Sequence, residues 1–569
     1  MNSQRRLPDP SDRWLLLVLA AAILSLVAWL LAHGVRVTEE DGFYYLKIAQ
    51  HLAAGAGSTF DGVNPTNGYH PLWALILVPL FRVSPTPAAA LNLAIMVQGL
   101  FMAGAVIFVY QTARLTTGRL SATAAALTWT WLTYRVGVGG LEFSIHALTV
   151  LAVGYLVLRH FALASPGRLA LYWLLGLLLG LTLLARLDTI LLGGVLILML
   201  AWRELRQIEP LRVCRTNLSL PYKPGIQRLA AVGLPILLVS GLYGGLNLAL
   251  FGHLTPVSGA IKRVWSAYLL TQDPYYVAYG WLIAKGYQLL WPFRHIDQAS
   301  SLSLISGVFG AGGLWLSGVL GPGGAAWAAW LRQVLRPWQP FIVYSILNYL
   351  SYGLLYHAYL SFSAWYYVIQ PWLVALLVAA LIDKLASLGR GRAGVDQRSQ
   401  PKQRWRSVAG PVLSLSLVML LVLVMIRAVA QWHTNDRLNR IPQPLYQAAG
   451  WIKANLPEEA TVGAWNAGAI GYLSERRVVN LDGLVNTWAF HQHQQYDLCR
   501  YWQEQGITHL VDVFDQRPGP KHVVPSAEPI YPYYARCADQ LELLWAAEIF
   551  PGAWWRLEAY RVRGSEGSP

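Results

Sequence analysis

The stretch WLLLVLAAAILSLVAWLLA, from Trp14 to Ala32, decides the kind of fold that this chain can adopt. It contains no charged residue and, as a helix, is long enough to cross the roughly 30 Å hydrocarbon core of a bilayer. Arg5, Arg6 and Arg13 precede it, and it lacks a small-residue cleavage site. These features are typical of a retained signal anchor whose N-terminus stays in the cytoplasm.

The composition of the whole chain indicates a polytopic α-helical membrane protein. Of its 569 residues, 55% are hydrophobic and only 13% are charged, which is more apolar surface than one soluble core can bury. Ten further apolar runs bring the predicted number of transmembrane helices to about eleven. These runs lie near residues 88–110, 120–136, 143–160, 169–184, 188–203, 229–251, 302–320, 339–357, 367–385 and 408–430.

One further apolar segment, HPLWALILVPLF from His70 to Phe81, is too short to span the membrane. A helix of this length rises only about 18 Å, so we expect an interfacial or re-entrant helix. Charge supports this choice, because eleven spans place half of the 44 lysines and arginines in cytoplasmic loops, whereas a twelfth span would invert the later loops. The net charge of +15 then reflects anchoring to anionic membrane lipids, and no single basic patch predicts nucleic-acid binding.

The composition changes near Gln431, which divides the chain into two predicted domains. Residues 1–430 form the transmembrane domain, whose first outer loop, residues 35–87, contains amphipathic helices. Residues 431–569 contain short strand and helix patterns between glycine-rich turns, and predict a small α/β domain. With eleven spans this domain is extracytoplasmic, and we expect a multi-pass protein of the plasma (inner) membrane.

The three cysteines and one histidine-rich segment permit predictions about disulfides and metal binding. Cys214 falls in a cytoplasmic loop and should stay reduced, whereas Cys499 and Cys537 share the outer domain and could form a disulfide. Spacing alone leaves that pairing open. The segment HQHQQ, residues 491–495, is more typical of a solvated turn than of a metal site.

Polar clusters gather in the predicted outer loops. TEEDGFYYLKIAQ, residues 38–50, places Glu39, Glu40 and Asp41 at the start of an amphipathic helix that should lie along the outer membrane surface. Helix capping by itself explains carboxylates at such a place. The turn-rich loop STFDGVNPTNGYHPLW, residues 58–73, follows directly, however. A polar loop beside the acidic residues favours a functional site.

Later outer segments add charge to the same face. Glu142, in GGLEFSIHAL, either caps the next helix or faces a wet cavity, and Arg186 and Asp188 could simply neutralise one another. Lys262 and Arg263 lie in a long outer loop, while SAWYYVIQPW, residues 363–372, is typical of an aromatic membrane anchor. Acids and bases on one face of an apolar bundle predict a substrate with an apolar tail and an anionic head.

Four motifs together resemble the GT-C superfamily of integral-membrane glycosyltransferases: EEDGFYYLKIAQHLAAGAGSTFDGVNPTNGYHPLW, GLEFSIHAL, RLDTILLG and NLDGLVN. The chain is similar to protein O-mannosyltransferases and to the aminoarabinose transferases that modify lipid A, over the first several spans and more loosely in the tail. The resemblance implies a GT-C-like fold. It also implies an enzyme that takes a sugar from a polyprenyl-phosphate carrier on the outer face of the membrane and passes it to a glycan, lipid or protein acceptor.

The resemblance also implies roles for individual residues. In the family, the first outer loop carries the catalytic acid, which matches Asp41 with Glu40 beside it, and Glu142 occupies the second acidic motif. Related sequences often have two aspartates or Asp-Glu where this chain has Glu-Asp, so which of the pair is the base stays open. The residues expected to bind the donor phosphate or the substrate are His70, Lys262, Arg186, Asn67 and Tyr69.

The chemistry of such a transfer sets what these groups must do. Cations stabilise the departing phosphate, and a carboxylate, here Asp41, takes the proton of the attacking hydroxyl, so direct displacement inverts the anomeric centre. No cofactor is required, although Asp41 and Glu142 could hold a divalent cation. A transporter or flippase of lipid-linked sugars is the competing hypothesis, and a glycan-binding scaffold is a third. Polar clusters at one surface favour the enzyme.

Overall fold

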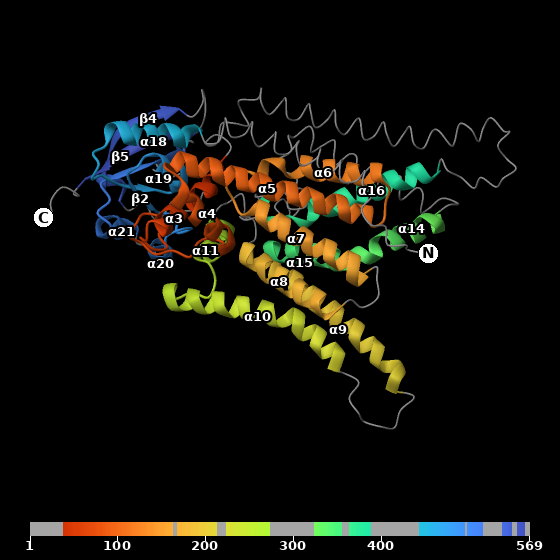
Figure 1. Ribbon diagram of the computed structural model, residues 1–569. Coiled ribbons are helices and arrows are strands. Elements are labelled where there is room, and N and C mark those ends of the chain that lie inside the picture. The colour runs from red at the N-terminus through yellow and green to blue at the C-terminus, as the bar shows by residue number, and fades with distance from the viewer. Residues whose placement is uncertain are drawn as a thin grey trace, which may run out of the picture.

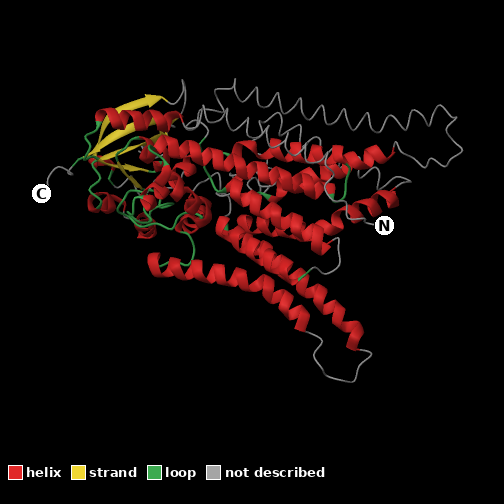
Figure 2. Ribbon diagram, viewed as in Figure 1, coloured by secondary structure: helices red, strands yellow, loops and turns green. Residues whose placement is uncertain are grey.

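The computed structural model describes residues 38–162, 168–212, 223–272, 324–355, 364–388, 443–495, 498–515, 537–548 and 555–563. Within this part of the chain, long helices lie side by side in one bundle, and a smaller domain of helices and strands covers one end of it (Figure 1). Figure 2 shows that the strands are confined to that smaller domain.

Helices occupy the predicted spans wherever the structure describes them. Among the described residues, four helical segments are long and apolar enough to cross a membrane, at 87–114, 143–161, 224–251 and 369–387. The predicted spans at 14–32, 302–320 and 408–430 lie outside the described residues, so the number eleven stays a prediction. The bundle helices are α5 (Pro87–Arg114), α6 (Arg119–Gly137), α7 (Phe143–Val157, continued by a π-helical turn to Ala162), α8 (Leu169–Ala185), α9 (Ile190–Arg212), α10 (Lys223–Phe251), α14 (Gly324–Leu335), α15 (Gln339–Leu355) and α16 (Ile369–Leu388).

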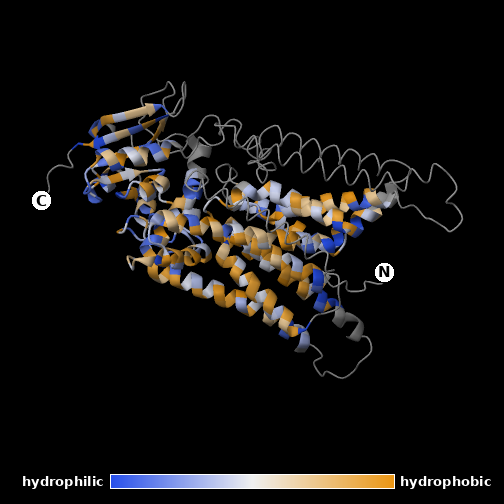
Figure 3. Cartoon of the chain, turned by 45° about the horizontal axis from the view of Figure 1, so that its top comes forward, coloured by the Kyte–Doolittle hydropathy of each residue, from blue (hydrophilic) through white to orange (hydrophobic). Residues whose placement is uncertain are grey.

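Packing in the bundle follows the pattern of membrane helices. α8 and α10 approach closely at Gly176, where a Cβ atom would lie 2.7 Å from the backbone oxygens of Ala231 and Val232. Small residues at such crossings allow backbones to meet without a hydrophobic driving force. The other side of α10 exposes large apolar residues such as Leu237 and Leu242, which suits contact with lipid. In Figure 3, which colours the cartoon by residue hydropathy, hydrophobic colours cover most of the bundle.

Two short helices connect the bundle to the outer domain. α4 (Pro71–Val83) is the short helix expected from the sequence, and the indole of Trp73 donates a 2.7 Å hydrogen bond to Gly140 O. α3 (Glu40–Ala53) forms where an amphipathic helix was expected, while its expected place along the membrane surface stays a prediction. Phe43, Leu46 and Ile48 are each 0% exposed, because α3 is packed between α4 and the outer domain. Its sequence pattern could not reveal that protein packs on its apolar residues.

The outer domain contains a five-stranded sheet with the order β2-β1-β3-β5-β4. β1 (Thr461–Ala464) pairs in parallel with β2 (Arg477–Asn480) and β3 (His509–Asp515), while β5 (Trp555–Val562) is antiparallel to β3 and to β4 (Leu541–Glu548). The parallel β1–β2 pair requires a crossover connection, which α19 provides. The helices of the domain are α18 (Gln443–Asn455), α19 (Ala467–Leu473), α20 (Thr487–Gln495) and α21 (Leu498–Glu504). The small α/β domain is therefore confirmed, while its extracytoplasmic place stays a prediction.

One expectation for this domain is wrong. HQHQQ is not a solvated turn but the last part of α20. His493 is buried, with Nε2 2.7 Å from Leu481 O and its ring edge-on to Trp465. The local sequence predicted a solvated turn because the apolar residues that bury this segment come from parts of the chain that are distant in sequence.

The outer domain docks on the bundle through a backbone contact. A Cβ atom at Gly68 would lie 1.7 Å from Leu484 O, so only glycine allows the loop after β2 to rest on the first outer loop. Nearby, the backbone N–H of Thr487 donates to Pro65 O at 3.2 Å. This contact joins two of the motifs that the resemblance was based on.

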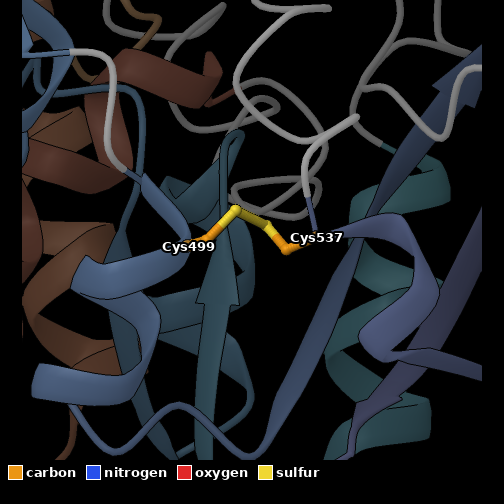
Figure 4. The surroundings of a disulfide bond; sticks show 2 residues. All are labelled: Cys499 and Cys537. Carbon is orange, nitrogen blue, oxygen red and sulfur yellow. A yellow bond between two sulfur atoms is a disulfide. The ribbon is translucent and has the colours of Figure 1, made fainter.

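Cys499 and Cys537 form a disulfide, the pairing that their spacing had left open (Figure 4). The bridge joins α21 to the segment that leads into β4, across 38 residues of sequence. We expect replacement of both cysteines by serine to lower the free energy of unfolding of the outer domain by about 4 kcal/mol, because the unfolded chain regains the entropy of a long loop. Thermal unfolding of the double variant against wild type under the same conditions measures this, and an unchanged transition would contradict it.

Candidate functional site

A cavity of about 430 Å³ lies where one end of the helix bundle meets α3, α11 (Val257–Gln272) and the outer domain. Six of the predicted site residues line it: Asp41, Tyr69, His70, Glu142, Arg186 and Lys262. Leu484 and Val485 of the outer domain close one side. Residues that are far apart in sequence therefore meet in one partly enclosed space.

The adjacent acids Glu40 and Asp41 face different surroundings. Asp41 lines the cavity, and within the described residues its carboxylate has no hydrogen bond or ion pair. Glu40 does not line the cavity, because its carboxylate accepts hydrogen bonds from the backbone N–H groups of Gly468 and Ala469, the latter at 3.0 Å. Successive residues of a helix point about 100° apart. The geometry thus favours Asp41 as the base and gives Glu40 a structural contact.

Burial dominates the protonation of both acids. It raises the pKa of Glu40 to about 8, although the backbone N–H groups of α19 oppose this. Burial also raises the pKa of Asp41 above its ordinary value, with Lys262 lowering it and Glu142 raising it. A carboxylate with a raised pKa and a cation opposite is a stronger base than an exposed aspartate.

Arg186 is the centre of a buried ion-pair cluster. Its guanidinium bonds to Glu142 through Nη1, to Asp188 Oδ1 at 3.2 Å through Nε, and to Tyr352 OH at 2.9 Å through Nη2. The expected neutralisation of Arg186 by Asp188 is thus present, and Glu142 adds a second acid. Because two carboxylates already neutralise its charge, Arg186 attracts a substrate phosphate less strongly than an unpaired arginine would.

The sequence left two interpretations of Glu142, helix capping or a place in a wet cavity, and the structure decides between them. Its side chain makes no cap hydrogen bond to α7, although it precedes the first residue of that helix. It is 2% exposed and lines the cavity beside Arg186. Burial by itself would raise the pKa of Glu142, but Arg186 and then His70 bring it below its ordinary value, so Glu142 stays ionised. An ionised partner of arginine is a poor proton acceptor, which argues against Glu142 as the base.

Lys262 and Tyr366 form the cationic side of the cavity. Lys262 Nζ donates a 2.8 Å hydrogen bond to Tyr366 OH, and the Arg186 guanidinium lies 4.6 Å from the centre of the same ring. Although burial lowers it, the pKa of Lys262 is raised overall by Tyr366 and Asp41, so the ammonium persists at neutral pH. Since an ammonium can only donate, the Tyr366 hydroxyl proton is directed to some other acceptor, such as an anion in the cavity.

The remaining predicted residues differ in their places. His70 lines the cavity with Nε2 3.9 Å from Glu142 Oε1, and burial lowers its pKa to about 4, so it is neutral at neutral pH. Tyr69 also lines the cavity, while its hydroxyl lies 2.7 Å from Ser58 Oγ.

Asn67 does not line the cavity. Its Nδ2 donates to Asn247 Oδ1 at 3.2 Å and to Thr255 O at 3.3 Å, and its Oδ1 accepts from the backbone N–H of Val257 at 3.0 Å. Val257 is the first residue of α11. Asn67 therefore holds the start of the helix that carries Lys262.

Tyr45, Tyr352 and Tyr366 line the cavity but were missed from the sequence. Tyr366 belongs to SAWYYVIQPW, and the expectation that this segment only anchors the protein in the membrane is wrong, because Tyr366 and Tyr367 are 8% and 0% exposed. Aromatic residues near a span end look alike whether they face lipid or protein. Only the two cations beside Tyr366 distinguish it.

The described residues contain no group of three or more His, Cys, Asp or Glu side chains placed to hold a metal ion. Glu142 is already bound to Arg186, so Asp41 and Glu142 do not fit a shared metal as they stand. The predicted divalent cation stays a prediction, and no step below depends on it.

Three comparisons relate the chain to known proteins. A profile of a domain of unknown function (DUF8728) matches residues 431–562, which is the outer domain. A comparison with curated protein sequences finds no match. The structure is similar to ArnT from Cupriavidus metallidurans bound to undecaprenyl phosphate, with 14% identity, a TM-score of 0.52, and coverage of 97% of this chain and 99% of that one.

Two further solved structures are similar with slightly lower scores. Apo ArnT from the same organism gives 15% identity and a TM-score of 0.49, over 99% of this chain and 100% of that one. The other is AglB, an oligosaccharyltransferase from Archaeoglobus fulgidus in complex with an inhibitory peptide and a dolichol-phosphate. It gives 12% identity and a TM-score of 0.49, over 88% of this chain and 70% of that one. At such identities a likeness shows the fold alone, and the full-length match shows that this chain has a fold similar to that of ArnT.

Proposed function

We propose that this protein is a membrane glycosyltransferase that moves a sugar from a polyprenyl-phosphate-sugar donor to an acceptor hydroxyl, with inversion at the anomeric carbon. The observation that carries the proposal is the cavity in which the Asp41 carboxylate lies opposite Lys262 and Tyr366, at one end of an apolar bundle. The similar ArnT structure, whose bound ligand is undecaprenyl phosphate, supports this donor class.

The mechanism assigns one task to each side of the cavity. Lys262 and the Tyr366 hydroxyl bind the phosphate oxygens and stabilise the charge that develops as the bond from C1 to the phosphate oxygen breaks. Asp41 accepts the proton of the acceptor hydroxyl while its oxygen forms the new bond to C1. Polyprenyl phosphate is then the leaving group. Arg186, held by two acids, orients Tyr366 and Glu142 around the reacting groups.

The place of the reaction follows from the predicted topology. With a cytoplasmic N-terminus and eleven spans, the cavity and the outer domain lie on the outer face of the plasma (inner) membrane. The apolar exposed side of α10 borders this end of the bundle and offers a surface for the polyprenyl chain, while Leu484 and Val485 put the outer domain beside the acceptor. The acceptor is a glycan, a lipid or a protein.

A transfer assay tests the proposal against transport. Purified protein in liposomes receives polyprenyl-phosphate donors with radiolabelled sugars, together with a panel of hydroxyl acceptors. We expect label to move from lipid to acceptor, polyprenyl phosphate to be released in equal amount, and the product to have the inverted anomeric configuration. Movement of intact donor between leaflets without bond cleavage would instead identify a flippase.

We expect the pH profile of transfer to have a single acidic limb. Asp41 acts as a base only when ionised, and burial raises its pKa, so kcat/KM should fall as the pH drops through a value above that of an ordinary aspartate. His70, with its pKa lowered to about 4, is neutral near neutral pH, and Lys262 stays charged there, so neither adds a limb near neutrality. Steady-state rates from pH 4 to 9 measure this, and a rate that rises toward low pH would contradict it.

A further inference from the structure

Two histidines from different domains face each other outside the cavity. His253 lies between the end of α10 and the start of α11, and His491 lies on α20 of the outer domain. Their Nε2 atoms are 3.5 Å apart, and their rings are 5.2 Å apart at 30°. Both side chains are partly buried, so water reaches the site. Neither residue takes part in the proposed transfer.

The spacing of these nitrogens suits a shared metal ion better than a hydrogen bond. A hydrogen bond from an N–H donor is normally 2.7–3.2 Å long, so 3.5 Å is too long for a good one. Two nitrogens at about 2.0–2.1 Å from one tetrahedral Zn²⁺ lie about 3.4 Å apart. The observed separation matches the second arrangement.

The surroundings also suit a metal ion. Among the described residues, these two rings have no hydrogen-bond partner besides each other. Phe490 packs edge-on against His253 and holds the ring in place.

We propose that His253 and His491 bind one Zn²⁺ ion, whose other positions are filled by water, and that this ion clamps the start of α11 to the outer domain. Imidazole nitrogen is a ligand of choice for Zn²⁺, Cu²⁺ and Ni²⁺, whereas Mg²⁺ prefers oxygen. α11 already packs on the outer domain through Val257 and Ile261, and it carries Lys262. The ion would thus stabilise the joint between the two domains, whatever reaction the cavity performs.

Calorimetric titration with Zn²⁺ tests this proposal on the full chain, purified without a histidine tag. We expect one ion per chain, binding weakened about tenfold or more in His253→Gln and in His491→Gln, and no binding of Mg²⁺ at this site. Cu²⁺ bound to the wild type should give an electron paramagnetic resonance spectrum with coupling to two imidazole nitrogens. Glutamine keeps the approximate size of each side chain, and gel filtration verifies that each variant is folded.

Two controls separate this site from others on the chain. His51→Gln removes a histidine that is bonded to Thr59 O elsewhere on the first outer loop, and should bind Zn²⁺ as the wild type does. Asp41→Asn removes the carboxylate of the cavity and should also leave this ion in place, so the outcome does not depend on the proposed transfer. Two outcomes would overturn the proposal. One is Zn²⁺ binding that is equal in the wild type and in both histidine variants, and the other is no binding by the wild type at about millimolar Zn²⁺.

Discussion

Asp41→Asn is expected to lower kcat for sugar transfer by about 10²–10⁴-fold, while the KM for the lipid donor changes little. The amide has the size of the carboxylate but cannot accept the proton of the acceptor hydroxyl. The donor still meets Lys262 and Tyr366, which are bonded to each other and not to Asp41. Initial rates at several donor concentrations separate kcat from KM.

Two matched variants make this result specific. Glu40→Gln changes the neighbouring acid, whose carboxylate contacts Gly468 and Ala469 rather than the cavity, and we expect a smaller loss that comes from looser docking of α19. Glu504→Gln changes a surface acid paired with Arg500, and should transfer sugar at the wild-type rate. Turnover of Asp41→Asn within a few-fold of wild type would show that another group is the base.

Arg186→Met is expected to destabilise the protein by about 3–5 kcal/mol, whether or not transfer is being measured. The arginine is 2% exposed and bonds to both Glu142 and Asp188, so methionine of similar length leaves two buried carboxylates without their cation. Thermal unfolding in detergent, followed at constant pH, measures the loss. The unfolding temperature should partly recover in Arg186→Met combined with Glu142→Gln, because one of the unpaired charges is then removed.

Lys453→Met provides the comparison for that effect. Lys453 pairs with Glu475 at 2.6 Å, and the two side chains are 51% and 64% exposed, so water stabilises the carboxylate that the substitution leaves behind. We expect a loss of at most about 1 kcal/mol. Equal unfolding temperatures for the two single variants would contradict the central role given to the Arg186 cluster.

The helices of the bundle could be predicted because their signal is local. A run of apolar residues at 87–114 or 369–388 has few alternatives to a helix in a membrane, where each backbone N–H and C=O must bond within its own segment. The short helix after His70 was predicted by length alone. The parallel strands of the outer domain were visible as brief apolar runs around glycines. Patterns that extend over a few neighbouring residues carry this information.

Patterns of one helix could not reveal what covers it. The periodicity of α3 indicated an amphipathic helix, but it could not show that the outer domain, about 400 positions later, contacts this helix. HQHQQ looked solvated for the same reason, since the residues around His493 come from other elements. Contacts over such separations leave no mark in a local window of sequence.

The sequence by itself determined that the chain is a helical membrane protein with a small α/β domain, and that its unusual polar groups gather at one end. Only the tertiary structure decided which of them share the cavity: Asp41 faces it and Glu40 does not, Arg186 is held by two acids, and Tyr366 joins Lys262. The physical reason is that a side chain's direction depends on the 100° turn between helical neighbours and on partners from distant segments, whereas apolar content depends on composition alone.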